Sequence, residues 1–238
     1  MVRYAVFFNE HLLTIHLSPI ASNARRRYTV DMILPKGYLS YSAWYLWRTN
    51  KQAYRDRYYS KERPPDFENA ETIFGKSVHE QIENGGLPHV PRFPLPEHKI
   101  EVEVAGIQLM GQIDTFDEET YSFADYKSGH ANKKGESPWT LAKVMKLDQL
   151  PFYAVMVDAK YGKVNPLCHL IWLETEFVKK STEFDGHVLE TISRDLQLTG
   201  RVESFPRKIA KWERDRMKNL IIETANEISE DYESFGKI

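Results

Sequence analysis

The sequence predicts an α/β fold whose core runs along the chain as one helix, three strands, a second helix and a fourth strand, with additions at both ends. Three observations predict it: apolar residues at helical spacing over residues 70–83, three β-like runs separated by turns over 99–127, and a helical stretch followed by an apolar run ending at residue 174. With 42% hydrophobic and 28% charged residues, the 238-residue chain suits one globular domain.

Two helical patterns occupy the amino-terminal half, after a short strand or hairpin arm at residues 4–15. In the first, Ser40 or Ser42 can cap a helix in which aromatic residues recur near helical spacing up to about residue 59. In the second, apolar residues recur every four positions from Phe74 to Ile82, and glycines at 85 and 86 end the helix.

Three β-like runs follow, at residues 99–105, 107–116 and 120–127, and the turns between them predict an antiparallel meander. A polar loop at 128–137 leads to a helical stretch that reaches about residue 161, in which Pro151 should cause a kink or a restart. Beyond it we expect a buried strand at 164–174, a neighbouring strand at 177–184 and a long helix at 205–232, starting after Pro206.

Charge and cysteine content limit the class of function. The formal net charge is −2 and the isoelectric point is near 6.5, so a polyanionic partner would have to be attracted by local basic patches and bound cations. The single cysteine, Cys168, excludes an internal disulfide and a multi-cysteine metal cluster, and fits a reducing cytoplasm. No run approaches the roughly 18 apolar residues that cross a bilayer, which predicts a soluble protein without a membrane partner.

Three polar side chains in the meander form the candidate reactive site. In an extended strand Asp125 and Lys127 project to the same face and Tyr126 to the other. Asp114, on the preceding strand, comes near them if the two strands pair through the turn at 117–119. Two close carboxylates repel each other unless a proton or a cation lies between them, and a divalent metal resolves the conflict.

Mg²⁺ prefers oxygen ligands and is commonly held by one or two carboxylates, which matches Asp114 and Asp125, with the Tyr126 backbone carbonyl as a further oxygen. Such an ion lowers the pKa of a bound water and polarises a phosphate, while Lys127 orients the water or neutralises charge in the transition state. The triplet alone also fits a surface salt bridge, because such a pattern arises often by chance.

Other polar residues near this triplet have ordinary interpretations as well. His79 lies on the helix before the meander, where a lone histidine is more often a core or capping residue than a ligand. Gln149 and Tyr153 share one face of the helix after the meander, as an exposed polar pair would.

Basic residues follow the proposed site. A loop that could hold phosphates contains Lys133, Lys134, Lys143 and Lys146, although a solvated face is an equally good explanation. Basic residues also open the carboxy-terminal helical pattern, where a solvated face is the better explanation. Trp44, Tyr45 and Trp47 could stack on bases, but core packing is the better explanation for them.

Taken together, four motifs resemble the RecB-type, Cas4-like branch of the PD-(D/E)XK nuclease superfamily. They are Phe74-Gly-Lys-Ser-Val-His79, Gly111-Gln-Ile-Asp114, Asp125-Tyr-Lys-Ser-Gly129 and Gln149-Leu-Pro-Phe-Tyr153-Ala154. The stretch from Leu39-Ser-Tyr-Ser-Ala43 to Gln52-Ala-Tyr-Arg55 resembles the opening helix of that branch. The resemblance covers about residues 38–173 and is specific through the combination of motifs.

The resemblance implies a restriction-endonuclease-like fold with a mixed central sheet flanked by helices. It implies that Asp114 and Asp125 bind Mg²⁺ or Mn²⁺, that His79 joins the metal site and that Lys127 is the catalytic lysine. Gln149 and Tyr153 would steady the active site or contact the DNA backbone. Asn50 and Lys51 stand where the first cluster cysteine of related members would fall, so no iron–sulfur cluster is expected. Asp125 replaces the glutamate of many members.

We therefore expect a single nuclease domain over residues 1–238, with its core at about 38–173, an amino-terminal arm at 1–37 and a strand-and-helix extension at 174–238. The expected activity is exonucleolytic cleavage of single- or double-stranded DNA, ends favoured, in a bacterial, archaeal or phage-infected cell. Recombination, helicase or CRISPR-adaptation proteins are the partners that the resemblance suggests. A structure-specific endonuclease or nickase, and a non-catalytic nucleic-acid-binding module, are the alternatives.

Overall fold

The structure, a computed structural model, describes residues 32–60, 69–162, 166–184 and 187–235, with the backbone alone over 180–194. The predicted arm at 4–15 lies outside the described residues. No helix within these ranges is long and apolar enough to cross a membrane.

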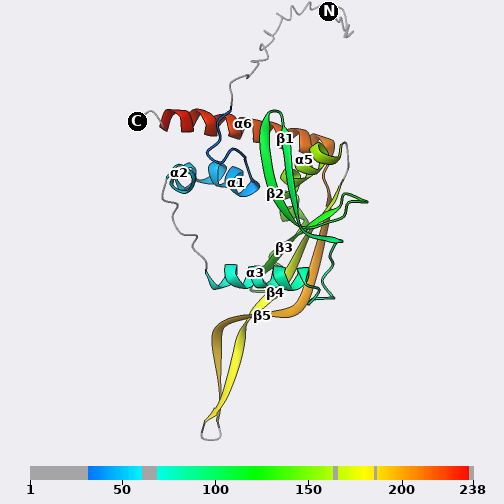
Figure 1. The fold of residues 1–238 in the computed structure, drawn as a ribbon. Coiled ribbons are helices and arrows are strands. Elements are labelled where there is room, and N and C mark those ends of the chain that lie inside the picture. Colours follow the sequence, from blue (N-terminus) through cyan, green and yellow to red (C-terminus); the bar gives the residue numbers. More distant parts are fainter. Residues whose placement is uncertain (1–31, 61–68, 163–165, 185–186, 236–238) are drawn as a thin grey trace, which may run out of the picture. The chain divides into compact units, whose positions relative to one another are not determined.

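A mixed five-stranded sheet forms the centre of the fold (Figure 1). Its strands follow the order of the chain: β1 (Leu95–Val104), β2 (Ile107–Phe116), β3 (Phe123–Gly129), β4 (Leu167–Phe184) and β5 (His187–Lys208). Every neighbouring pair is antiparallel except β3 and β4, which are parallel. A parallel pair needs a long crossover, and here the crossover contains α4 (Leu141–Val144) and α5 (Gln149–Tyr161). The predicted α/β class, mixed sheet and meander are confirmed.

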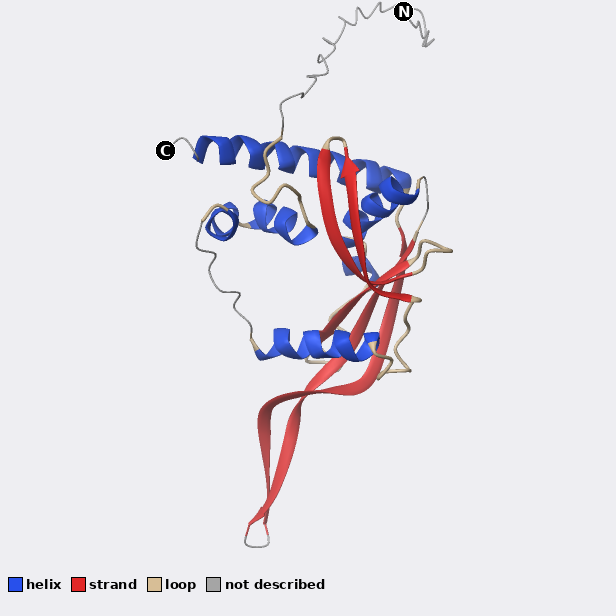
Figure 2. Cartoon of the chain, in the orientation of Figure 1, coloured by secondary structure: helices blue, strands red, loops and turns tan. Residues whose placement is uncertain are grey.

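Helices lie on both faces of the sheet (Figure 2), and the two hydrophobic cores that they form with it differ in size. The larger core joins β1 to β4 with α1 (Tyr41–Thr49), α5 and α6 (Lys211–Phe235). The smaller core joins α3 (Ala70–Glu83), through Val78 and Ile82, to Ala124 and Tyr126 of β3 and to β4. Because side chains alternate along β3, Phe123 belongs to the larger core and Ala124 to the smaller one.

The first predicted helix is two helices. Asn50 ends α1 and caps α2 (Lys51–Tyr58), its side chain accepting a hydrogen bond from the Ala53 N–H at 3.0 Å. An asparagine can both end one helix and cap the next because its side chain replaces a missing helical acceptor. Trp44 and Trp47 are buried in the larger core, as expected for packing residues, whereas Tyr45 is exposed.

Pro151 lies in the first turn of α5, which begins anew at Gln149, so the predicted restart is confirmed. Proline is tolerated there because the first N–H groups of a helix have no partner within it.

The carboxy-terminal elements differ from the prediction. Residues 177–184 continue β4, with irregular pairing near Thr175 and Lys179, and do not form a separate neighbouring strand. Residues 205–208 end β5, and the last helix begins at Lys211 instead of after Pro206. Pro206 pairs with His169 in β5, which is an edge strand. Edge strands tolerate proline, because only one of their two sides is hydrogen-bonded to a neighbouring strand.

Arg207 links β5 to α6 and to the segment before α5. The sequence placed it among solvated basic residues, but it is buried, paired with Glu213 at 2.5 Å. It also donates to the carbonyls of Val144 at 2.7 Å and Leu147 at 3.0 Å. Arg207 therefore ties the segment leading into α5 to β5 and α6.

Candidate active site

The site begins where β2 and β3 separate. The two strands pair only at Thr115 with Ala124 and at Phe116 with Phe123. Beyond the pair of Thr115 and Ala124, the Tyr126 N–H on β3 donates to Oδ2 of Asp114 on β2 at 2.7 Å. The side chain of Asp114 therefore takes over a hydrogen bond that a strand would normally supply, which fixes its carboxylate between the two strands.

Asp125, Lys127 and Gln149 form a connected polar group beside Asp114. Lys127 Nζ lies 2.7 Å from Asp125 Oδ2 and donates to Gln149 Oε1 at 3.1 Å. Gln149 Nε2 donates to Asp125 Oδ1 at 2.7 Å, so the first residue of α5 is bonded to both reactive side chains of β3. The predicted alternation along β3 is confirmed, because the Tyr126 hydroxyl points away and donates to the Pro91 carbonyl at 2.8 Å.

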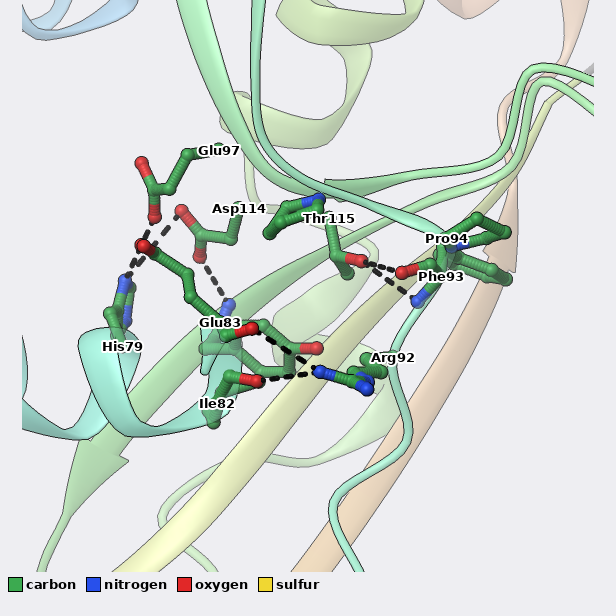
Figure 3. A pocket seen from close by; sticks show the side chains of 11 residues that line it. His79, Ile82, Glu83, Arg92, Phe93, Pro94, Glu97, Asp114 and Thr115 are labelled. Atoms are coloured by element: carbon green, nitrogen blue, oxygen red, sulfur yellow. Dashed lines mark hydrogen bonds and ion pairs between the residues drawn. The ribbon is translucent and has the colours of Figure 1, made fainter. Parts of the chain in front are cut away.

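Asp114 forms a second group with His79 and Glu97, on the side of Asp114 that faces α3 (Figure 3). His79 Nδ1 lies 3.8 Å from Asp114 Oδ1 and 3.9 Å from Glu97 Oε1. One potential ligand atom from each residue lies within 4.8 Å of the others. Glu83, one turn after His79 on α3, shares a hydrogen bond with Glu97. Asp114 thus lies between the two groups, as a member of the second and bonded to the β3 backbone next to Asp125 of the first.

Glu97 and Glu83 were missed in the sequence, although signals for both exist. The pairing of Val104 with Ile107 fixes the hairpin register, which places Glu97 opposite Asp114. The predicted strand began at Lys99, two residues too late to include it. Glu97 also has a φ of 46°, a left-handed conformation that a non-glycine residue adopts rarely and that occurs at strained functional positions. Glu83 lies four residues after His79, the spacing of one helix face.

The electrostatics of the site favour a bound cation. Burial, followed by the charge of Asp125, raises the pKa of Asp114 to about 7, against the opposing effects of the Tyr126 N–H and Lys127. Burial, the hydrogen bond with Glu83 and the charge of Asp114 raise the pKa of Glu97 to about 7. Both carboxyl groups therefore retain protons up to neutral pH unless another positive charge replaces those protons.

The donor set suits a hard divalent ion. The second group and Asp125 offer carboxylate oxygens, which are the ligands that suit Mg²⁺ and Mn²⁺, together with one imidazole nitrogen. Lys127 balances only one of the negative charges, and its ammonium is already directed at Asp125. The residues present therefore fit a divalent metal.

Tyr153 lies behind Gln149, as their spacing on one helix face predicts. Its hydroxyl is hydrogen-bonded to Gln149, and its ring is buried against Tyr41 and Phe123. A Cβ atom at Gly111 would lie 3.1 Å from both Tyr153 and Met156, so glycine in β2 lets α5 approach this closely. Of the two roles left open by the sequence, the burial of Tyr153 suits support of the site better than contact with DNA.

The four lysines of the predicted basic loop are exposed. Lys143 donates to the Pro138 carbonyl, and none of the four forms an ion pair within the described ranges. They lie in the connection between β3 and α5, whose two ends carry Lys127 and Gln149. Their exposure leaves them accessible to an anionic ligand.

Comparison with known proteins gives a family for this arrangement. The sequence model of a family described as the PD-(D/E)XK nuclease superfamily matches residues 88–233. No curated protein matches the chain. Among solved structures, one named SSO0001 is 12% identical, with a TM-score of 0.39, over 81% of this chain and 76% of that one. A "putative exonuclease" from Eubacterium rectale is 9% identical, with a TM-score of 0.48, over 90% of this chain and 88% of that one.

Proposed function

This chain belongs to the PD-(D/E)XK nuclease superfamily, and from that premise we propose that it is a deoxyribonuclease that uses Mg²⁺ or Mn²⁺ and degrades DNA from its ends. The observation that carries the proposal is the position of Asp114. It joins a group that can hold a metal to a group that presents an ordered lysine. A protein that only binds nucleic acid has no need for both groups on neighbouring residues of β2 and β3.

Residues of β1, β2, β3 and α3 would hold the metal. The metal would be held by Asp114 and Asp125, with His79, Glu97 and the Tyr126 carbonyl as further donors. When bound, the ion activates a water and polarises the scissile phosphate. In the reaction the water oxygen bonds to phosphorus, one P–O ester bond breaks and the leaving oxygen takes a proton.

Lys127 would neutralise negative charge that grows on the phosphate oxygens in the transition state. Asp125 and Gln149 hold its ammonium at 2.7 Å and 3.1 Å, so its position is fixed before substrate arrives. Such preorganised charge is usually the largest contribution to catalysis of this kind. Tyr153, hydrogen-bonded to Gln149, supports this arrangement from inside the core.

The test is incubation of the full chain with linear single-stranded, linear duplex and closed circular DNA, in Mg²⁺, Mn²⁺ or EDTA. Asp125→Ala and Lys127→Ala should lose cleavage, while Lys160→Ala, an exposed lysine at the other end of α5, should retain it. Cleavage that persists in EDTA, or in both site variants, would exclude the proposed site. Cleavage of closed circles would replace the exonuclease by the alternative, an endonuclease or nickase on the same fold.

A further inference from the structure

A pocket of about 420 Å³ opens directly beside the metal-binding group (Figure 3). His79, Glu97 and Asp114 line one side of it. The opposite wall comes from the segment just before β1 and contributes Arg92, Phe93 and Pro94. The pocket therefore has an acidic end, where a cation would lie, and a second end with an arginine and apolar surface.

Two hydroxyl groups hold the second wall in place. Thr115, which is 1% exposed, donates to the Phe93 carbonyl at 2.9 Å and accepts from the Phe93 N–H at 2.8 Å. The Tyr126 hydroxyl donates to the Pro91 carbonyl at 2.8 Å. Thr115 and Tyr126 directly follow Asp114 and Asp125, so the strands that position the two carboxylates also fix the wall of the pocket. A pocket built this way exists before its ligand binds.

Arg92 is positioned as an anion-binding group. Its Nη1 donates to the carbonyls of Ile82 at 3.1 Å and Glu83 at 3.3 Å, which anchors the guanidinium at the end of α3. Within the described part of the chain, its Nε and Nη2 atoms donate no hydrogen bond, and the residue is exposed. An anchored guanidinium with free N–H groups pairs well with a phosphate.

The size and charge of the pocket select its occupant. A volume of about 420 Å³ lies at the small end of the range for ligand pockets, so it suits one nucleotide and excludes a duplex. With the scissile phosphate at Asp114, Arg92 would need a second phosphate on the same nucleotide. A 3′-terminal nucleotide offers only the scissile phosphate, whereas a 5′-phosphorylated terminal nucleotide carries two.

We propose that this pocket binds the terminal nucleotide of a 5′-phosphorylated DNA strand, with the 5′-phosphate on Arg92 and the base against Phe93 and Pro94. This inference rests on the proposed nuclease function, and it adds the polarity of digestion and the type of end that is recognised. Because the proposed function is degradation from an end and the pocket volume suits one nucleotide, the product of each cut would be a mononucleotide.

Binding can be measured separately from cleavage in the Lys127→Ala protein with Mg²⁺, using single-stranded oligonucleotides that differ only in a 5′-phosphate or a 5′-hydroxyl. We expect the 5′-phosphate to bind at least about tenfold more tightly, as a charge-assisted pair should. Arg92→Gln should abolish the difference without weakening the 5′-hydroxyl strand. Arg48→Gln, at an arginine whose only ion pair in the described ranges is with exposed Glu223, should keep the difference.

Arg92 also stabilises the end of α3, so Arg92→Lys and thermal melting of each variant serve as controls for this structural role. The lysine variant keeps the charge and should keep part of the preference. Absence of a preference in the parent protein, a preference that survives Arg92→Gln, or equal weakening of both strands by that change would overturn the inference. Failure of the wild-type chain to cleave any DNA would instead overturn the proposed function.

Discussion

Gln149→Leu tests whether α5 orders the reactive residues. The change keeps the size of the side chain and removes, besides the bond with the Tyr153 hydroxyl, two hydrogen bonds to charged partners, at 2.7 Å to Asp125 and 3.1 Å to Lys127. Such bonds contribute roughly 1.5–3 kcal/mol each. Since the Lys127 side chain is 31% exposed, water can replace one of them in part, and we expect a net loss of stability of about 2 kcal/mol.

The effect on catalysis should exceed the effect on substrate binding. Asp125 and Lys127 would remain paired, but both could rotate away from the metal and the phosphate. Changes to residues that orient metal ligands typically cost about 10- to 100-fold, so we expect kcat to fall by that factor with KM nearly unchanged.

Urea unfolding and steady-state cleavage of a labelled oligonucleotide provide the two measurements. Gln197→Ala is the matched control, because Gln197 also donates to a carboxylate, Glu176, but at an exposed position on β5. If Gln149→Leu leaves kcat within about twofold of wild type while the control behaves as expected, the reasoning that Gln149 positions the reactive pair is refuted.

Three further predictions concern the metal group and the buried ion pair. Because burial and Asp125 raise the pKa of Asp114 to about 7, the native state retains a proton that the unfolded chain releases near pH 4. Stability in EDTA therefore falls as pH rises between these values, and Asp114→Asn should stabilise the protein more at pH 8 than at pH 5 in urea unfolding; an equal effect at both pH values would contradict the shift. Glu97→Gln should weaken Mn²⁺ binding about tenfold or more by calorimetry, and unchanged affinity would remove Glu97 from the ligand set. Arg207→Met should cost roughly 3–5 kcal/mol because it leaves Glu213 buried without its partner. Adding Glu213→Leu should restore most of that stability, and a neutral single variant would show that the pair does not hold β5 to α6.

Local patterns were sufficient where an element is regular and its neighbours are close in the chain. The recurrence of Phe74, Val78 and Ile82 predicted α3 with its observed bounds, and alternation along β3 predicted that Asp125 and Lys127 meet. Residues 187–204 of β5 carried no prediction, and its last residues were assigned to a helix because Pro206 suggested a helix start; only pairing with β4 shows that an edge strand tolerates this proline.

By itself the sequence determined the α/β class and singled out Asp114, Asp125 and Lys127, because side-chain periodicity and motif order are properties of the chain, and the family resemblance added the mixed sheet. Only the tertiary structure decided which residues lie close enough to share one ion and what else surrounds them. Glu97 joins His79 because strand pairing places it opposite Asp114, and the pocket beyond them exists because Thr115 and Tyr126 anchor a loop from elsewhere in the chain. Contacts of this kind depend on pairing register and packing between distant segments, which local sequence periodicity does not encode.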